Sequence, residues 1–337
     1  MTWRPDFIAG NTRLRARLSA MLDASDYERL TDSSLDAAVD SLGATAYRPH
    51  LDRCRAEDRE VLDAVTERLR VLLRGVRGVY GGAAGEVVSI LLARHDLADT
   101  LALLRGGRTG QPAGERLAAV MAVGAVDEQA AAEVADAVDG ATAMTRLAAH
   151  RLPDPATARV LPAAWDRFEL TADPNELETS IAASAVHQWI SALTRSGKAA
   201  RPVLELVKAE CDRANLLAVL RDPADDAPRQ LPAGRLDPAA LLAARKSGVT
   251  GLVAVRPEWR QALYRYTRDG ELVELEWNLD VAIWRGAVRR LRLGDPLGAD
   301  VPVGYALAAE CEARNVRLLL LAARRGPVTD VRPLLVA

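Results

Sequence analysis

Histidines and cysteines are the residues of this 337-residue sequence best suited to bind a metal or act as nucleophiles. The three cysteines are odd in number and lie far apart, with neither a zinc-ligand spacing nor a disulfide pattern. The four histidines are equally scattered, and no two stand one helical turn apart. We therefore predict no metal site, no catalytic residue and a reducing compartment. The residues concerned are Cys54, Cys211, Cys311, His50, His95, His150 and His187.

Glycine-rich segments offer a second route to chemistry, because their backbone amides can hold phosphate. Gly197-Lys198 is followed by alanine and lacks a glycine five residues earlier, so it is not a P-loop. The glycines of residues 78–85 lack dinucleotide-binding spacing and a preceding strand, and instead predict a turn between helices. No Gly-x-Ser-x-Gly elbow is present. The sequence thus predicts a protein that is not an enzyme and binds no nucleotide and no cofactor.

An internal repeat contains the more informative polar residues. Residues 202–220 and 302–320 are identical at seven of nineteen positions when aligned with an offset of 100. Each copy has an acid followed three residues later by an amide, and residues 86–105 form a fainter third copy with two aspartates. Side chains three residues apart share one face of a helix. The six residues are Asp96, Asp99, Asp212, Asn215, Glu312 and Asn315.

Two roles for these pairs stay open at this point. Each pair could bond an adjacent helix of its own bundle, since buried polar groups normally find partners. Alternatively, the three faces could line a shared polar cavity that binds a partner. A period of about 100 residues exceeds the roughly 20–50 residues of solenoid repeats. We predict three helical repeats, 1–112, 113–228 and 229–337.

Helix signals recur along the chain. Asp173-Pro174-Asn175-Glu176 predicts a helix start, with the helix continuing to about Ser196. Asp237-Pro238 and Ser33-Ser34-Leu35-Asp36 predict shorter helices, whereas 249–255 is the weakest helical segment. No stretch alternates long enough to predict a strand, and the 49% hydrophobic content suffices for a core. We predict an all-α fold.

Charge and hydropathy limit the partners. The net charge of −2 provides no general attraction for nucleic acid. The first residues lack a signal-peptide pattern and the longest apolar run is about half a membrane span, so we expect a soluble cytoplasmic protein. Arg13 and Arg17 share one predicted helix face, with Arg15 beside them. They indicate either a solvated face or a site for an acidic protein, because guanidinium groups pair bidentately with carboxylates.

Several short motifs follow one another from about Phe7 to the last helix. They are Asn11-Thr12-Arg13-Leu14-Arg15, Leu42-Gly43-Ala44-Thr45-Ala46-Tyr47, residues 91–105, residues 210–221, Asp295-Pro296-Leu297-Gly298, Tyr305 and residues 310–317. In this order and spacing they resemble the family of C subunits of the rotary V/A-type ATPases, which are called d subunits in eukaryotes. The sequence departs from the family pattern at Ala9, Asp99 and Leu321.

The resemblance implies a funnel of three helical bundles about a pseudo-threefold axis. It further implies a central-stalk rotor subunit, peripheral on the cytoplasmic face of the membrane, that couples ATP chemistry to ion movement. The expected partners are the central-shaft subunits and the membrane proteolipid ring, with no nucleotide or nucleic acid and membrane association through the ring only. The candidate partner-binding residues are the three acid–amide pairs and the arginines at 13, 15 and 17. One alternative is a free-standing helical scaffold that binds soluble proteins, and another is a helical enzyme with an unfamiliar site.

Overall fold

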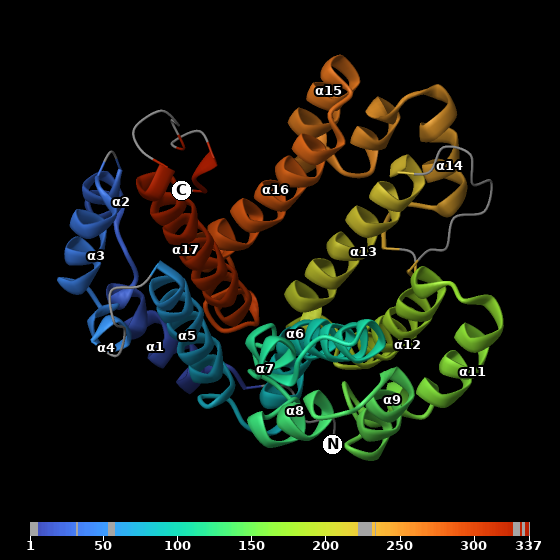
Figure 1. Ribbon diagram of the computed structural model, residues 1–337. Helices are drawn as coiled ribbons and strands as arrows, with labels where there is room; N and C mark the ends of the chain where they lie inside the picture. The colour runs from blue at the N-terminus through green and yellow to red at the C-terminus, as the bar shows by residue number, and fades with distance from the viewer. Residues whose placement is uncertain are drawn as a thin grey trace. The chain divides into compact units, whose positions relative to one another are not determined.

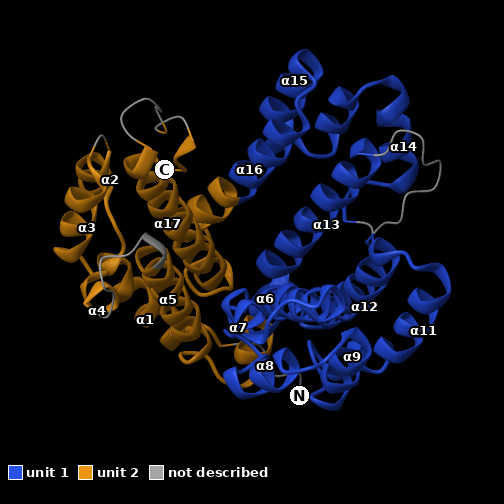
Figure 2. Cartoon of the chain, in the orientation of Figure 1, with its two compact units in different colours: residues 1–5, 89–283 blue, residues 6–88, 284–337 orange. Residues whose placement is uncertain are grey.

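The computed structural model describes the chain except for residues 1–5, 32, 53–57, 222–230, 233, 326–330, 332–333 and 337. All regular elements in this described part are helices, so the predicted all-α class is confirmed (Figure 1). The described residues divide into two compact units, 89–283 and 6–88 with 284–337 (Figure 2). Helices α6 (Gly82–Thr109) and α16 (Leu272–Leu293) each contribute to both units. The three-repeat division stays a prediction, and its boundary at 228/229 lies outside the described residues.

The unit of residues 6–88 and 284–337 is organised by two long helices, α5 (Asp58–Arg77) and α17 (Asp300–Arg325), which pack against each other. The C-terminal part of α16 packs closely on α17, because a Cβ at Gly304 would lie 2.5 Å from the Leu291 Cβ. Phe7 and Tyr305 are fully buried in this unit. Its shorter helices are α1 (Ile8–Arg17), η1 (Leu18–Ala20), α2 (Ala24–Leu30), α3 (Leu35–Gly43) and α4 (Arg48–Leu51).

The unit of residues 89–283 contains the long helices α12 (Pro174–Arg195) and α13 (Arg201–Arg221), which also pack together. Two apolar clusters form its core, one around Leu147 and Ile181 and the other around Trp259. Burial of each large apolar side chain contributes about 1.5–3 kcal/mol. The shorter elements are α7 (Ala113–Ala118), α8 (Glu128–Ala135), α9 (Gly140–Ala149), α10 (Pro155–Ala158), α11 (Leu161–Thr171), η2 (Gly197–Ala200), α14 (Pro238–Ser247), η3 (Val249–Ala254), η4 (Pro257–Trp259) and α15 (Arg260–Asp269).

The predicted helix starts are confirmed by their caps. The Asp173 carboxylate accepts the backbone N–H groups of Asn175 and Glu176, which α12 itself cannot satisfy. Ser34 and Asp237 cap α3 and α14 in the same way. The weakest predicted segment, near Val249, forms the 3₁₀ helix η3. Over the described residues, no helix has both the length and the apolar character needed to cross a membrane.

Candidate partner-binding residues

Asp96 and Asp99 lie one turn apart on α6, and both side chains are buried. Each carboxylate accepts two backbone N–H groups at 2.8 to 2.9 Å from the segment that precedes α8. A Cβ at Gly124 would clash with the Asp96 carboxylate, so this close approach requires glycine. The two acids therefore hold the segment 121–126 against α6. The donors are Met121, Ala122, Ala125 and Val126.

Asp212 on α13 is fully buried and accepts five N–H donors, two from a side chain and three from the backbone. One oxygen accepts the guanidinium of Arg256, from Nε at 2.8 Å and from Nη2, and this arginine is itself only 2% exposed. Asn215, one turn later, exchanges two bonds with Leu231: its Nδ2 donates to the carbonyl at 3.1 Å and its Oδ1 accepts the N–H at 2.7 Å. The backbone donors to Asp212 are Gly234, Arg235 and Leu236.

Glu312 and Asn315 are buried at the equivalent positions of α17. The Glu312 Oε2 accepts the N–H of Leu22 at 2.7 Å, and its Oε1 accepts the Nε of Arg68 at 3.1 Å. Asn315 exchanges two bonds with Val336, donating at 2.8 Å and accepting at 3.1 Å. The third pair thus repeats the arrangement of the second, with a longer acid that reaches a more distant part of the chain.

Arg68 compensates the buried charge of Glu312. It is 5% exposed, donates to two backbone carbonyls at 2.5 and 3.1 Å, and places its guanidinium carbon 4.6 Å from the ring centre of Tyr47. Burial, reinforced by the negative charge of Glu312, raises the pKa of the Tyr47 hydroxyl well above its ordinary value. The cluster therefore contains one buried negative charge and one buried positive charge, with a neutral phenol beside them. The two carbonyls belong to Ala20 and Ala46.

All three acids accept the N–H of an aliphatic residue that directly precedes an aspartate N-cap. The caps begin α2, α8 and α14. Taken with the predicted repeats, the acid of the first holds the start of the second, and the acid of the second holds the start of the third. Glu312, in the third predicted repeat, accepts the N–H of Leu22 in the first repeat, 290 residues away in sequence, and so completes a cyclic order of contacts. The three dipeptides are Leu22-Asp23, Val126-Asp127 and Leu236-Asp237.

Loop geometry explains why the first copy has an aspartate where the others have an amide. Asp99 faces two N–H groups and no carbonyl, so an acceptor-only side chain fits. Asn215 and Asn315 each face one N–H and one carbonyl, which an amide satisfies with its oxygen and nitrogen. Sequence reasoning found these positions but missed Arg68 and Arg256. The repeated aliphatic-Asp dipeptide at helix starts was the signal that could have located the loops.

Burial of Asp99 leads to a pH-dependent prediction. Desolvation raises the pKa of its carboxyl above 3.8, although the two backbone bonds offset part of the rise. The folded chain therefore binds this proton more tightly than the unfolded chain, so the contribution to stability is largest below pH 3.8 and is lost as the pH rises through the raised pKa. Compared with Asp99→Asn, the wild type should lose free energy of unfolding between acidic and neutral pH, as measured by urea denaturation.

Asp139 provides a control of opposite sign. Hydrogen bonds from Thr142 lower the pKa of this exposed carboxyl, so its contribution is present at neutral pH and is lost on acidification. Wild type compared with Asp139→Asn should therefore gain free energy of unfolding as the pH rises. Parallel pH profiles for the two substitutions would contradict the burial argument for Asp99.

The arginines at 13, 15 and 17 lie on α1, and all three are exposed. Arg17 donates to the Gly75 carbonyl at 2.9 Å. The neighbouring Asn11 is buried: it donates to the carbonyls of Pro296 and Gly298 at 2.8 and 3.0 Å and accepts the hydroxyl of Tyr80 at 2.6 Å. Asn11 thereby joins the motif of residues 11–15 to the motif of residues 295–298. Partner binding by the three arginines stays a prediction.

The remaining reactive residues show no assembled site in the described part of the chain. No group of three or more histidine, cysteine and acidic side chains is arranged there to hold a metal ion. Cys211 and Cys311 are both buried. Burial raises the pKa of Cys211 to about 12, so its thiolate form is suppressed at neutral pH.

The described part of the chain is thus all-helical, with buried polar contacts between successive helical segments. The sequence matches the model of the family described as ATP synthase (C/AC39) subunit over residues 10–333. The chain belongs to this family, the C or d subunits of the rotary V/A-type ATPases. A comparison with curated proteins found no match. Family membership associates the chain with other rotary ATPase subunits.

Proposed function

We propose that the chain is a non-catalytic rotor subunit of the central stalk, a socket that couples the central shaft to the membrane proteolipid ring. In this role it transmits torque between ATP chemistry and ion movement on the cytoplasmic face of the membrane. It binds no nucleotide or nucleic acid, and it meets the membrane through the ring only. The family and the cyclic order of the polar contacts support the proposal.

The cyclic order of these polar contacts is the main observation that supports the proposal. Contacts that pass from the first predicted repeat to the second, from the second to the third and from the third to the first agree with the three similar bundles that the family resemblance implies. Buried, fully bonded side chains hold their loops at fixed distances, and close-packed interiors resist deformation. A part that transmits torque requires this stiffness more than reactive groups. Glu312 supplies a buried charged contact between the last predicted repeat and the first, beside the packing of α5 on α17 and the bonds from Asn11 to Pro296 and Gly298.

Purification from native membranes tests the function. A tagged chain should co-purify with the proteolipid ring and with the shaft subunits in mild detergent, because specific interfaces of this kind bury more than about 1,000 Å². Recovery alone, or only with soluble proteins unrelated to a rotary ATPase, would favour the helical scaffold. Nucleotide binding by the purified chain would contradict the proposal that it binds no nucleotide.

Charge reversal on α1 tests the arginines as a partner surface. We expect Arg13→Glu, Arg15→Glu and Arg17→Glu together to reduce co-purification with the other subunits, because each exposed ion pair contributes about 0.2–1 kcal/mol. Quantitative mass spectrometry of the recovered subunits is the measurement. Reversal of Arg201, Arg260 and Arg265, which are also exposed, is the control of equal charge. Equal recovery of the two variants would remove α1 from the candidate surfaces.

Asn215→Leu tests the acid–amide pairs. The variant loses both bonds to Leu231 and leaves a backbone N–H and carbonyl unpaired, at a cost of about 1–3 kcal/mol. If the pairs also line a polar cavity for the shaft, recovery with shaft subunits should fall more than the loss of stability explains. Unchanged recovery with an intact fold would leave Asn215 a purely structural role. The other five side chains also have partners inside their own unit, so a cavity formed by them stays a prediction.

A further inference from the structure

The C-terminal part of α16 carries an uncompensated row of positive charge. Arg285, Arg289 and Arg292 are spaced four and three residues apart, which places them on one face of the helix. They and Arg290 are exposed, and none forms an ion pair with a described carboxylate. Residues 281–294 contain no aspartate or glutamate. We call Arg285, Arg289 and Arg292 the arginine row.

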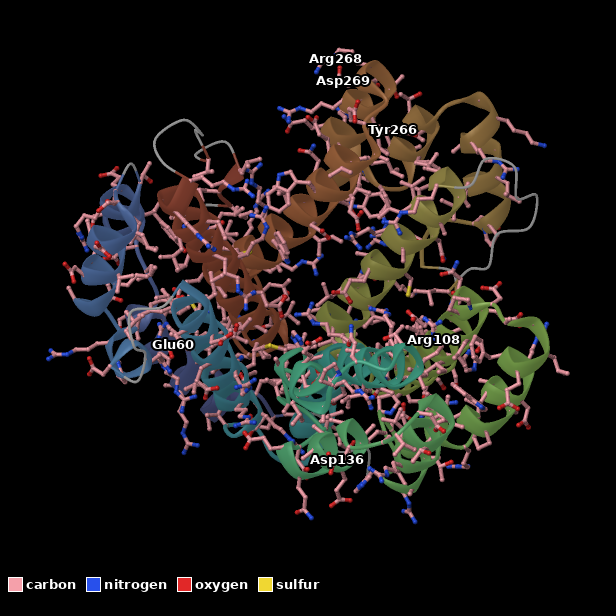
Figure 3. The ribbon with its side chains drawn as sticks, viewed as in Figure 1. Glu60, Arg108, Asp136, Tyr266, Arg268 and Asp269 are labelled. Carbon is pink, nitrogen blue, oxygen red and sulfur yellow. The ribbon has the colours of Figure 1, made fainter. Side chains whose placement is uncertain are left out.

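Arginines on other helices of the chain have carboxylate partners close to them in sequence. On α5, Arg70 pairs with Glu67 on the same helix. The exposed Arg268 at the end of α15 pairs with its neighbour Asp269 at 2.6 Å (Figure 3). Arginines with a local carboxylate have a structural explanation that the arginine row lacks.

The arginine row lies at the same end of its unit as α1. Asn11 is bonded both to the turn that follows α5, through Tyr80, and to the turn that follows α16, through Pro296. Because one side chain reaches both turns, the ends of α5 and α16 meet beside α1. Exposed Arg13 and Arg15 add to the positive charge there.

Exposed apolar side chains accompany these charges. Leu293 is 73% exposed, Leu297 is 59% exposed and Ile8 is 55% exposed, all at this end of the unit. A Cβ at Gly286, beside the arginine row, would meet no atom within 4 Å, so the helix backbone is open to close approach. Apolar contacts interspersed with arginine are characteristic of protein interfaces.

We propose that the arginine row, with Arg13, Arg15, Leu293 and Leu297, forms a docking surface for an acidic protein surface. The proposal builds on the proposed function, in which other subunits hold this chain. Guanidinium groups at helical spacing match carboxylates spaced along a second helix. The exposed Leu293 directly follows Arg292 and provides an apolar contact beside them. A lipid surface fits less well, because the continuous apolar face of α16, including Leu291, is packed on α17, and only the separate side chains of Leu293, Leu297 and Ile8 are exposed.

Photo-crosslinking in the intact cell tests the proposal. The full chain carries p-benzoylphenylalanine in place of Arg289 or, as control, Arg265, and crosslinked peptides are identified by mass spectrometry. The position on α16 should give a crosslink to a protein segment of net negative charge, absent at the control position. Crosslinks to phospholipid alone, to neutral or basic segments, or at no greater yield than the control would overturn the proposal.

Charge substitution then separates this inference from the proposed function. Arg285→Glu, Arg289→Glu and Arg292→Glu together should lower recovery of the crosslinked protein about tenfold, while the lysine triple variant retains most of it. Reversal of Arg201, Arg260 and Arg265 should leave it unchanged. Equal recovery in both reversed variants overturns the docking surface even if the wild type co-purifies with rotary ATPase subunits. Failure of that co-purification rejects the proposed function instead, and an acidic crosslink would still support the surface.

Discussion

Replacing Arg256 with methionine is expected to lower the free energy of unfolding of the 89–283 unit by about 3–5 kcal/mol. The side chains of Arg256 and Asp212 are 2% and 0% exposed, so the substitution leaves a buried carboxylate without its counter-charge. Three backbone N–H groups still bond that carboxylate, but none carries a full positive charge. Urea denaturation followed by far-ultraviolet circular dichroism at neutral pH measures the change.

Arg235 offers a matched control in the loop that Asp212 holds. Its guanidinium pairs with Glu205, but its side chain is 40% exposed. Exposed pairs contribute about 0–1 kcal/mol, so Arg235→Met should have a small effect. Similar losses for the two substitutions would show that burial of the Arg256–Asp212 pair is not what stabilises this loop. If the charge pair is the cause, combining Asp212→Asn with Arg256→Met should cost less than the sum of the two separate changes.

The elements of the fold were predictable where local chemistry defines them. An aspartate followed by proline places a cap and a fixed φ at a helix start, and both are present at Asp173 and Pro174. The three repeat copies were likewise predictable as helices, because few polar residues interrupt their apolar faces. These are properties of neighbouring residues. The division into two units was not predictable, since it depends on contacts between distant segments.

The candidate site was predictable only in part, for the same reason. Repetition identified the acid–amide positions, but their partners depend on how the following loop turns. Asp99 bonds two successive N–H groups, and one of the donors, Ala122, has a positive φ of 48°, which no composition rule predicts for alanine. Arg256 lies 44 residues from Asp212, and nothing in its local sequence distinguishes it from the exposed arginines.

Both interpretations of the pairs from sequence can now be compared with the contacts. Every one of the six side chains is bonded within its own unit, which is the behaviour expected of buried polar groups. A partner that also used these atoms would have to replace existing bonds, or bind the loops that they position. Partner affinity should therefore be more sensitive to surface charge than to these pairs. Substitutions in the arginine row and of the arginines on α1 are therefore the more direct test of partner binding.

Glu312→Gln is expected to lower the free energy of unfolding of the unit of residues 6–88 and 284–337 by about 3–5 kcal/mol. The amide has nearly the shape of the acid and can still accept the Leu22 N–H, but it leaves the Arg68 guanidinium buried without a negative partner. Urea denaturation is again the measurement. Glu28→Gln removes one charge from an exposed position of the same unit and should change stability little.

The same substitution tests whether the closing contact matters for assembly. If the contact from Glu312 to Leu22 and Arg68 joins the last repeat to the first, weakening it should reduce recovery with shaft and ring subunits at temperatures where the variant is still folded. Asp96→Asn is the comparison, because Asp96 tests a tie between successive repeats that the peptide chain also connects. We expect the Glu312 variant to lose more partner protein than the Asp96 variant at equal loss of stability. Equal recovery of the two would show that the cyclic order is a consequence of folding with no separate part in holding the rotor together.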